Sequence, residues 1–191
     1  IVNFTSISEK MDPDELGSFL NFYLTTMSEL VLRYGGTIDK FIGDAVMVFF
    51  GDPESRGEQN DALACVCMAL AMGETMETLK NRWMANGISN PPSLRMGIHS
   101  GICKVGNFGT ENRLEYTALG KAVNLASHLE AAAKVNEIVI SQSTYNLVKH
   151  LVHCTPREPI KMKGFANSLT AYSAIKITEN NHLVTNAVSQ R

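Results

Sequence analysis

The chain has 191 residues, of which 45% are hydrophobic and 19% are charged, so it is long enough for one well-packed core. A formal net charge of −2 argues against the strong basic field that binds nucleic acid or anionic membranes. The four cysteines form no Cys-x-x-Cys pair, which favours free thiols in a reducing compartment. We expect a cytoplasmic domain with no membrane span or direct membrane contact, although a larger parent protein could be anchored.

The first predicted element is a long helix that starts at Asp12-Pro13 and stops at Gly35-Gly36. An acidic N-cap before a proline is a typical helix start, and glycine is a typical stop. Two β-rich runs follow at residues 37–42 and 45–50. The Gly43-Asp44 pair between them predicts a hairpin that presents Asp44 at its turn.

The rest of the chain alternates helices with short strands and hairpins. We predict a helix at 60–83, a strand at 94–105, a β-ribbon at 107–116, a helix at 120–134, a strand at 138–140, a short helix from 143, and strands at 151–154, 160–162 and 169–175. Because hairpins replace single parallel strands, we predict an α/β (α+β) fold rather than a doubly wound one. Its expected form is a ferredoxin-like βαββαβ core with helices covering a mixed antiparallel sheet.

Six segments, in chain order, resemble signature segments of class III nucleotidyl cyclases. They are IVNFT (1–5), KFIGD (40–44), RMGIHSG (95–101), YTALG (116–120), VNLAS (123–127) and KG (163–164). Six ordered matches are far more specific than one motif. The resemblance covers residues 1–176 and implies a class III cyclase catalytic domain at residues 1–178, followed by a tail at 179–191.

The resemblance implies that the domain converts ATP to 3′,5′-cyclic AMP and pyrophosphate. In this reaction the ribose 3′ oxygen attacks the α-phosphorus, so cations must neutralise the negative charge of the triphosphate. We expect two Mg²⁺ ions per site, for which Mn²⁺ could substitute. Asp44 and the carbonyl of Ile1 are the expected metal ligands, and the family's other metal aspartate is expected directly before Ile1, outside this sequence. The amides around Phe4 and Thr5 are expected to face the terminal phosphates.

Lys40 and Thr117 are the residues that the resemblance assigns to the base. Adenine offers an acceptor at N1 and an amino donor at N6, and guanine offers the reverse, so a lysine, which can only donate, favours adenine. Thr117 would accept from N6. Guanylyl cyclases of this family have an acidic residue at the Lys40 position and typically a cysteine at the Thr117 position. The Lys/Thr pair resembles the bicarbonate-responsive adenylyl cyclases of bacterial type, class IIIb.

Asn124, His128 and Lys163 are the remaining candidates. Asn124 and His128 are four residues apart and share one helix face. A largely apolar core face is marked by Val123, Ala126, Leu129 and Ala133. By resemblance, Asn124 orients the ribose and Lys163 binds the terminal phosphates. His128 departs from the family, which has a transition-state arginine there, and a histidine lacks the fork of donors. Taken singly, each of these residues is commonplace on a helix face or before a turn.

The family geometry predicts a homodimer with two equivalent sites at its interface. Asp44 and the phosphate-facing turn would come from one protomer, and the base, ribose and transition-state residues from its partner. The alternatives are a guanylyl cyclase, a diguanylate cyclase, which the sequence at 35–39 disfavours because it lacks an acidic loop, and a degenerate domain that serves as a dimerising signalling module. His99 and Arg113 are interpreted as a structural residue and a solvated hairpin residue.

Overall fold

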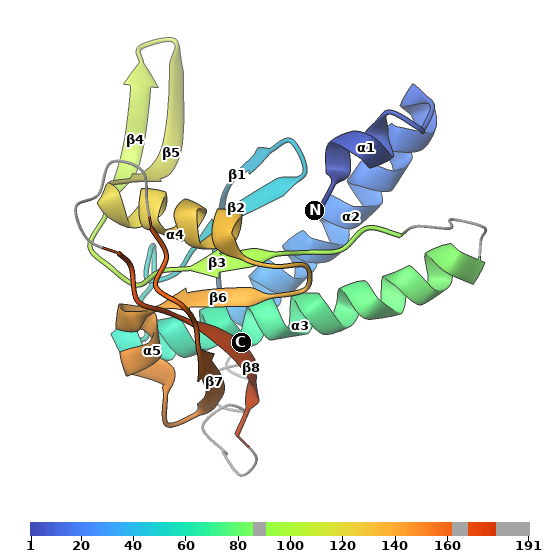
Figure 1. Cartoon of the computed structure of the whole chain (residues 1–191). Coiled ribbons are helices and arrows are strands. Elements are labelled where there is room, and N and C mark those ends of the chain that lie inside the picture. The colour runs from blue at the N-terminus through green and yellow to red at the C-terminus, as the bar shows by residue number, and fades with distance from the viewer. Residues whose placement is uncertain (86–90, 162–167, 179–191) are drawn as a thin grey trace.

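The computed structural model describes residues 1–85, 91–161 and 168–178 (Figure 1). In chain order the elements are α1 (Phe4–Ser8), α2 (Pro13–Tyr34), β1 (Thr37–Ile42), β2 (Ala45–Phe49), α3 (Glu58–Ala85), β3 (Met96–Ile98), β4 (Lys104–Thr110), β5 (Arg113–Leu119), α4 (Lys121–Ala132), β6 (Ile138–Ser141), α5 (Gln142–Val148), β7 (Val152–Pro156) and β8 (Ala171–Ile177).

The first long helix and the hairpin after it form as the sequence predicts. The carboxylate of Asp12 accepts hydrogen bonds from the Asp14 and Glu15 amides at 3.0 and 2.9 Å, and Gly35 ends α2 with a φ of 79°. Such capping satisfies backbone donors that the first helical turn leaves unpaired. β1 then pairs antiparallel with β2 up to Ile42 opposite Ala45, so Asp44 lies in the turn.

A mixed four-stranded sheet forms the centre of the domain in the order β3-β6-β8-β7. β3 is parallel to β6, and the other neighbours are antiparallel. Val2 makes an isolated antiparallel bridge with Ser93, three residues before β3. The order Val2, α2, β1, β2, α3, β3 is therefore βαββαβ, and the predicted α+β class with a mixed sheet is confirmed.

Two predicted strands are shorter than expected. The strand predicted at 94–105 ends at Ile98, because His99 and Ser100 leave the ladder and bond to the start of α5 instead. His99 Nδ1 lies 3.0 Å from Ser141 Oγ, and Ser100 Oγ lies 3.0 Å from Thr144 Oγ1. The strand predicted at 160–162 is reduced, among the described residues, to one bridge between residues 160 and 169. The predicted tail at 179–191 lies outside the described residues.

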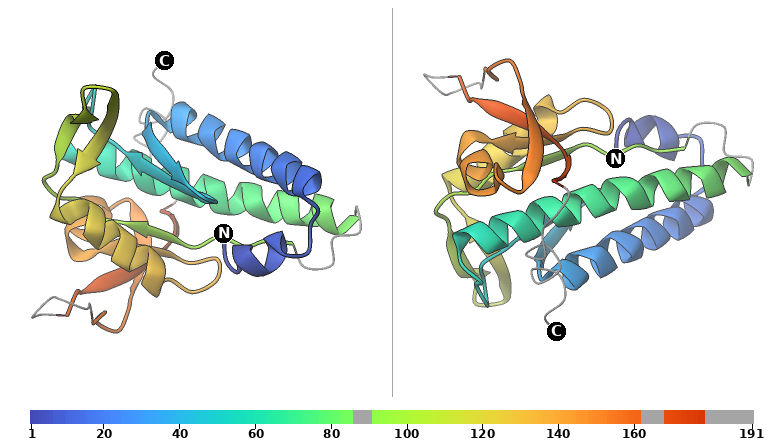
Figure 2. Two further views of the ribbon diagram at one scale, coloured as in Figure 1. Left: turned by 90° about the horizontal axis from the view of Figure 1, so that it is seen from above. Right: turned by 90° about the horizontal axis from the view of Figure 1, so that it is seen from below.

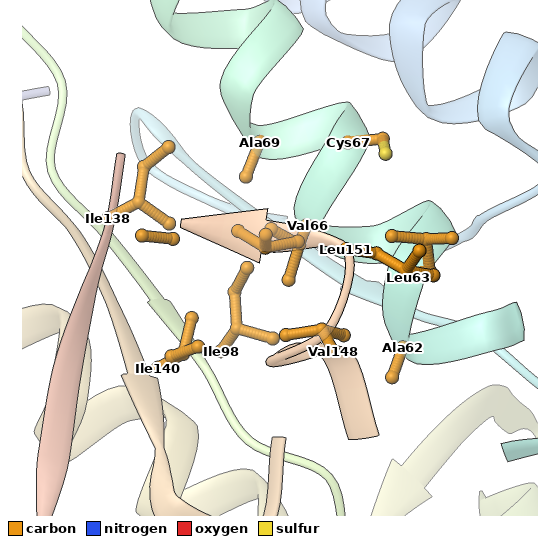
Figure 3. Packing of buried hydrophobic residues seen from close by; sticks show 12 residues of the cluster. Ala62, Leu63, Val66, Cys67, Ala69, Ile98, Ile138, Ile140, Val148 and Leu151 are labelled. Atoms are coloured by element: carbon orange, nitrogen blue, oxygen red, sulfur yellow. The ribbon is translucent and has the colours of Figure 1, made fainter. Parts of the chain in front are cut away.

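Helices cover both faces of the sheet, α4 on one and α3 on the other (Figure 1). The alternation along β6 shows why: Ile138 and Ile140 pack with α3 and α5, whereas Val139 packs with Leu129 of α4. Figure 3 shows the first of these clusters, in which Ile98 and Val148 meet side chains of α3. Period-two burial on both sides is typical of a strand covered by two layers.

Helix α3 is the one described helix that by length and composition could span a bilayer, because an 18-residue window within Glu58–Met84 has a mean hydropathy of 1.4. We predicted no membrane span, and the packing of α3 bears on that prediction. One side of α3 contributes Leu63 and Val66 to the sheet core, and the other contributes Met72 and Met76 to a second cluster with α2. A helix packed on two sides is apolar nearly all round. We therefore interpret α3 as a core helix.

Candidate active site

The two positions expected to hold metal lie together at the tip of the β1–β2 hairpin. The main-chain nitrogen of Ile1 is 2.6 Å from Asp44 Oδ2. Figures 1 and 2 show the N-terminus beside that tip. Gly43 supplies the positive φ of 62° that this turn needs. Asp44, the next residue in the turn, is partly exposed. A carboxylate and a neighbouring main chain offer hard oxygen donors, the kind that Mg²⁺ prefers.

Phe4 and Thr5 lie directly beyond this point, as the first two residues of α1. Asn3 precedes them with a left-handed φ of 58°, which asparagine tolerates better than most residues. The chain therefore turns sharply between Val2 and α1. The first amides of α1 therefore follow directly after this turn, and their contact with the terminal phosphates stays a prediction.

An irregularity in β1 decides where Lys40 points. Ile38 pairs with Val48 and Lys40 with Met47, so Asp39 is an extra residue in the strand. In a regular strand, consecutive side chains point to opposite faces, and a bulge changes that direction locally. Here both Asp39 and Lys40 contact β5: Lys40 reaches Glu115, and Asp39 reaches the residue two places on, Thr117.

Lys40 is held by an ion pair. Its Nζ donates to Glu115 Oε2 at 2.9 Å, and Arg113 donates to the other oxygen of Glu115 at 3.0 Å. The hydrogen bond raises the pKa of Lys40 and lowers the pKa of Glu115, so both groups are charged at neutral pH. With side-chain exposures of 35% and 47%, the pair is accessible to solvent and its net contribution to stability is small. An ammonium group has three protons, so the bond to Glu115 does not use all the donors of Lys40.

Asp39 is the site residue that sequence reasoning missed. Its side chain is 0% exposed, and it accepts hydrogen bonds from the Thr117 hydroxyl at 2.9 and 2.8 Å and from the Ala118 amide at 2.8 Å. Lys40 Nζ lies 3.6 Å from Asp39 Oδ1. The available signal was an aspartate within a β-rich run, where this residue is depleted.

The β4–β5 ribbon has a second polar attachment. The Tyr116 hydroxyl donates to Asp52 Oδ1 after β2, and this bond raises the pKa of Tyr116. Tyr116 also packs against Phe49, with ring centroids 6.4 Å apart. β5 is therefore fixed against the β1–β2 hairpin through two carboxylates, Asp39 and Asp52.

Asn124 and His128 lie on α4, four residues apart as predicted. Asn124 is exposed and His128 is partly buried, whereas Leu129 on the opposite side is fully buried. This confirms the predicted division of α4 into a polar face and a core face. The joint action of Asn124 and His128 with Asp44 stays a prediction.

The backbone of α4 approaches β3 closely at Gly97. A Cβ at residue 97 would overlap the Glu130 nitrogen and the Ala126 carbonyl oxygen and would lie 2.8 Å from Glu130 Cα. Arg95 strengthens the same contact with a hydrogen bond to Glu130 Oε1 at 2.5 Å. The position of the α4 polar face thus depends on a glycine in the neighbouring strand.

Three further sequence predictions concern basic residues. Lys163 lies outside the described residues. His99 is half-buried, and burial lowers its pKa, consistent with its predicted structural role. Arg113 has an 83% exposed side chain that pairs with Glu115, as expected of a solvated hairpin residue.

Comparison with known proteins adds a family match. The profile described as Adenylate and Guanylate cyclase catalytic domain matches residues 1–176. Adenylate cyclase 1 of Rhizobium meliloti is 34% identical over 93% of this chain. The crystal structure of the adenylyl cyclase CyaB from P. aeruginosa superimposes with a TM-score of 0.91 at 46% identity, covering 93% of this chain and 91% of that one. The guanylyl cyclase Cya2 superimposes with a TM-score of 0.88 at 31% identity, covering 95% and 91%. The chain spans only 26% of the length of the R. meliloti relative.

Proposed function

This chain belongs to the family of adenylate and guanylate cyclase catalytic domains, and we propose that it converts ATP to 3′,5′-cyclic AMP and pyrophosphate. We take residues 1–178 as the catalytic unit of a longer protein. The relatives include both adenylyl and guanylyl cyclases, so the choice of base has to be argued from this chain's own residues.

The pairing of Lys40 with Thr117 is the observation that supports ATP. Both side chains approach the same oxygen, Asp39 Oδ1, at 3.6 and 2.9 Å. An ammonium group donates to adenine N1, an acceptor, but not to guanine N1, which carries a proton. A hydroxyl beside it can accept from the adenine amino group. The two positions are therefore adjacent and have the polarity that adenine needs.

Asp44 and the carbonyl of Ile1 are our proposed ligands for Mg²⁺, two ions per site, with Mn²⁺ as a substitute. No group of three His, Cys, Asp or Glu side chains that could hold a metal occurs within residues 1–85, 91–161 and 168–178. A single carboxylate with main-chain and substrate oxygens nevertheless suits Mg²⁺, which often uses one or two carboxylates and phosphates. Bound there, the ions would neutralise charge on the triphosphate.

The other residues would hold the substrate around the reacting atoms. Asn124 is proposed to orient the ribose, and His128 to donate to the charge that develops at the α-phosphate. For the terminal phosphates, the proposed contacts are the amides of Phe4 and Thr5 and the side chain of Lys163. Holding the 3′ hydroxyl in line with the α-phosphorus supplies the effective molarity that cyclisation needs.

The site is proposed to form between two copies of the chain. Asp44 of one protomer would act with Lys40, Thr117, Asn124 and His128 of the other. Several large apolar side chains on the hairpins are exposed, including Phe41 at 47% and Leu114 at 61%. Their exposure in the single chain supports an interface on this side of the domain.

The proposal is tested by measuring kcat/KM of the purified protein for ATP and GTP, with Mg²⁺ and with Mn²⁺. We expect cyclic AMP as the main product in both metals. A preference for GTP would instead make the domain a guanylyl cyclase. Nucleotide-dependent thermal stabilisation without either product would make it a dimerising module.

Complementation tests the shared site. Asp44→Ala and Asn124→Ala should each abolish turnover, but a heterodimer of the two contains one intact site. With random pairing, half of the dimers are mixed and one of their two sites is intact, so an equal mixture should recover about a quarter of the activity. A mixture as inactive as its parts would refute the proposed division of residues.

A further inference from the structure

We infer that Asp39 determines which bases the site accepts, because its carboxylate accepts a hydrogen bond from the Thr117 hydroxyl. Thr117 Oγ1 can then only accept a hydrogen bond from the base. This inference rests on the proposed function and deepens it. Asp39 is a positioning residue in this view: it acts on the base through Thr117 and makes no contact with the nucleotide itself.

The geometry leaves the Thr117 hydroxyl one direction for its proton. Both Asp39 oxygens lie within hydrogen-bond distance of Thr117 Oγ1, at 2.9 and 2.8 Å. An ionised carboxylate can only accept, and a hydroxyl has one proton, so Thr117 donates to Asp39. The lone pairs of Oγ1 remain for another group. They can accept from an amino group such as adenine N6, and they repel a carbonyl oxygen such as guanine O6.

The environment of Asp39 keeps its carboxylate in this role. The side chain is 0% exposed, and a buried charge is tolerated only where hydrogen bonds and a counter-charge compensate it. The Ala118 amide donates to Oδ2 at 2.8 Å, and the Lys40 ammonium lies 3.6 Å from Oδ1. Hydrogen bonds to a charged acceptor are roughly twice as strong as neutral ones, so the hydroxyl is held firmly.

The bulge in β1 is a second, independent observation. It makes Asp39 the extra residue of the strand, between the pairs Ile38–Val48 and Lys40–Met47. Without it, Asp39 and Lys40 would point to opposite faces of the hairpin. With it, consecutive residues contact Thr117 and Glu115 on one face of β5. Bulges next to functional sites commonly redirect a side chain in this way.

Thr117 is a buried residue, only 5% exposed, so water has little access to it. In so confined a place, a mismatch of donor and acceptor cannot be relieved by water. The orientation of one proton therefore becomes a means of selecting the base.

The test compares binding of ATP with binding of purine riboside 5′-triphosphate, which retains the N1 acceptor but lacks the 6-amino group. Isothermal titration calorimetry measures both affinities without requiring turnover. We expect the wild-type protein to prefer ATP by about tenfold, the usual net value of one buried hydrogen bond.

Asp39→Asn should reduce this preference. The carboxamide oxygen would take the Oδ2 position beside the Ala118 amide, where it still accepts from the Thr117 hydroxyl. The NH₂ group at the Oδ1 position would donate to Thr117 Oγ1 and compete with the amino group of the base for its lone pairs. Asp39→Thr, which suits a strand and whose hydroxyl both donates and accepts, should relax the preference in the same way if the asparagine variant does not fold.

Two controls separate this role from a structural one. Thr117→Val should also abolish the preference, and adding Asp39→Asn to it should change nothing further, because residues that act through one contact are not additive. Asp52→Asn removes the other carboxylate that fixes β5 and should leave the preference at its wild-type value.

The possible results distinguish failure of the inference about Asp39 from failure of the proposed function. An unchanged preference in folded Asp39→Asn would overturn the inference while leaving the proposed function intact, as would full additivity with Thr117→Val. A wild-type protein that binds both nucleotides equally would refute the Thr117 contact, and with it the inference. A wild-type protein that binds neither would refute the proposed function itself.

Discussion

Gly97→Ala should move α4 and thereby impair both folding stability and turnover. The added Cβ would overlap main-chain atoms of Glu130 and Ala126, and a main-chain atom cannot move aside as a flexible side chain can. Overpacking typically costs about 1–3 kcal/mol, and we expect the upper end here, about 3 kcal/mol. For a chain of this size, that lowers Tm by about 6–12 °C.

Gly73→Ala is a matched control, because a Cβ built at Gly73 in the middle of α3 has no atom within 4 Å besides its chain neighbours and the adjacent backbone of its own helix. It should stabilise the domain by about 0.5–1 kcal/mol, since alanine loses less backbone entropy than glycine in a helix. Thermal unfolding followed by circular dichroism gives both Tm values, and steady-state kinetics gives turnover. If Gly97→Ala had the Tm and kcat of the wild type, the close approach of β3 and α4 would not position the site.

Four other perturbations test individual residues. Asp44→Ala should abolish metal-dependent cyclic AMP formation without lowering the folded fraction, because the proposed metal ligand is lost. Lys40→Glu with Thr117→Cys should shift the ratio of kcat/KM values towards GTP, although two substitutions should recover only part of the roughly 10⁴-fold discrimination that hydrogen-bonding pockets reach. His128→Arg should raise kcat more than it changes KM, by less than the about 10²- to 10³-fold of an optimal donor, and His128→Ala should lower kcat. His99→Gln should flatten the dependence of Tm on pH below about 6.5.

The sign of the last effect follows from burial. Desolvation lowers the pKa of His99 in the folded state, so the unfolded chain takes up a proton at higher pH. The stability associated with neutral His99 is therefore complete above the unfolded pKa of about 6.5 and is lost as the pH falls through the folded value. An equally steep loss of Tm in His99→Gln would assign the effect to another group.

Wild-type kinetics in the other variants would contradict the roles proposed for the substituted residues. Full turnover in folded Asp44→Ala would remove the metal assignment. A specificity ratio that did not move in the Lys40 and Thr117 double variant would remove the proposed base contacts. If alanine at residue 128 were harmless and arginine gave no gain, the role of His128 in the transition state would have to be abandoned.

The sequence predicted helix ends, turns and helix faces correctly where all the groups that form them lie within a few residues of one another. Asp12 caps α2 through amides two and three residues away, and Gly43 allows the turn that presents Asp44. The division of α4 into a polar and a core face follows from helical spacing alone. The strand predicted at 94–105 was wrong at residues 99 and 100, because they bond to the start of α5, about forty residues further along the chain. Its last two residues, Lys104 and Val105, belong to the separate strand β4.

By itself, the sequence determined the order of helices and hairpins and placed the candidate residues on a helix face, a hairpin turn and a ribbon, because capping, turn formation and periodicity act over a few residues. Only the tertiary structure decided which side chains meet. Asp39 reaches Thr117 across 78 positions, and Arg95 reaches Glu130 across 35. The bulge that turns Asp39 towards β5 arises from packing between elements. So does the close approach of α4 to β3, which leaves no room for a side chain at Gly97. Such contacts depend on the positions of both elements, and the sequence of one element does not predict the position of the other.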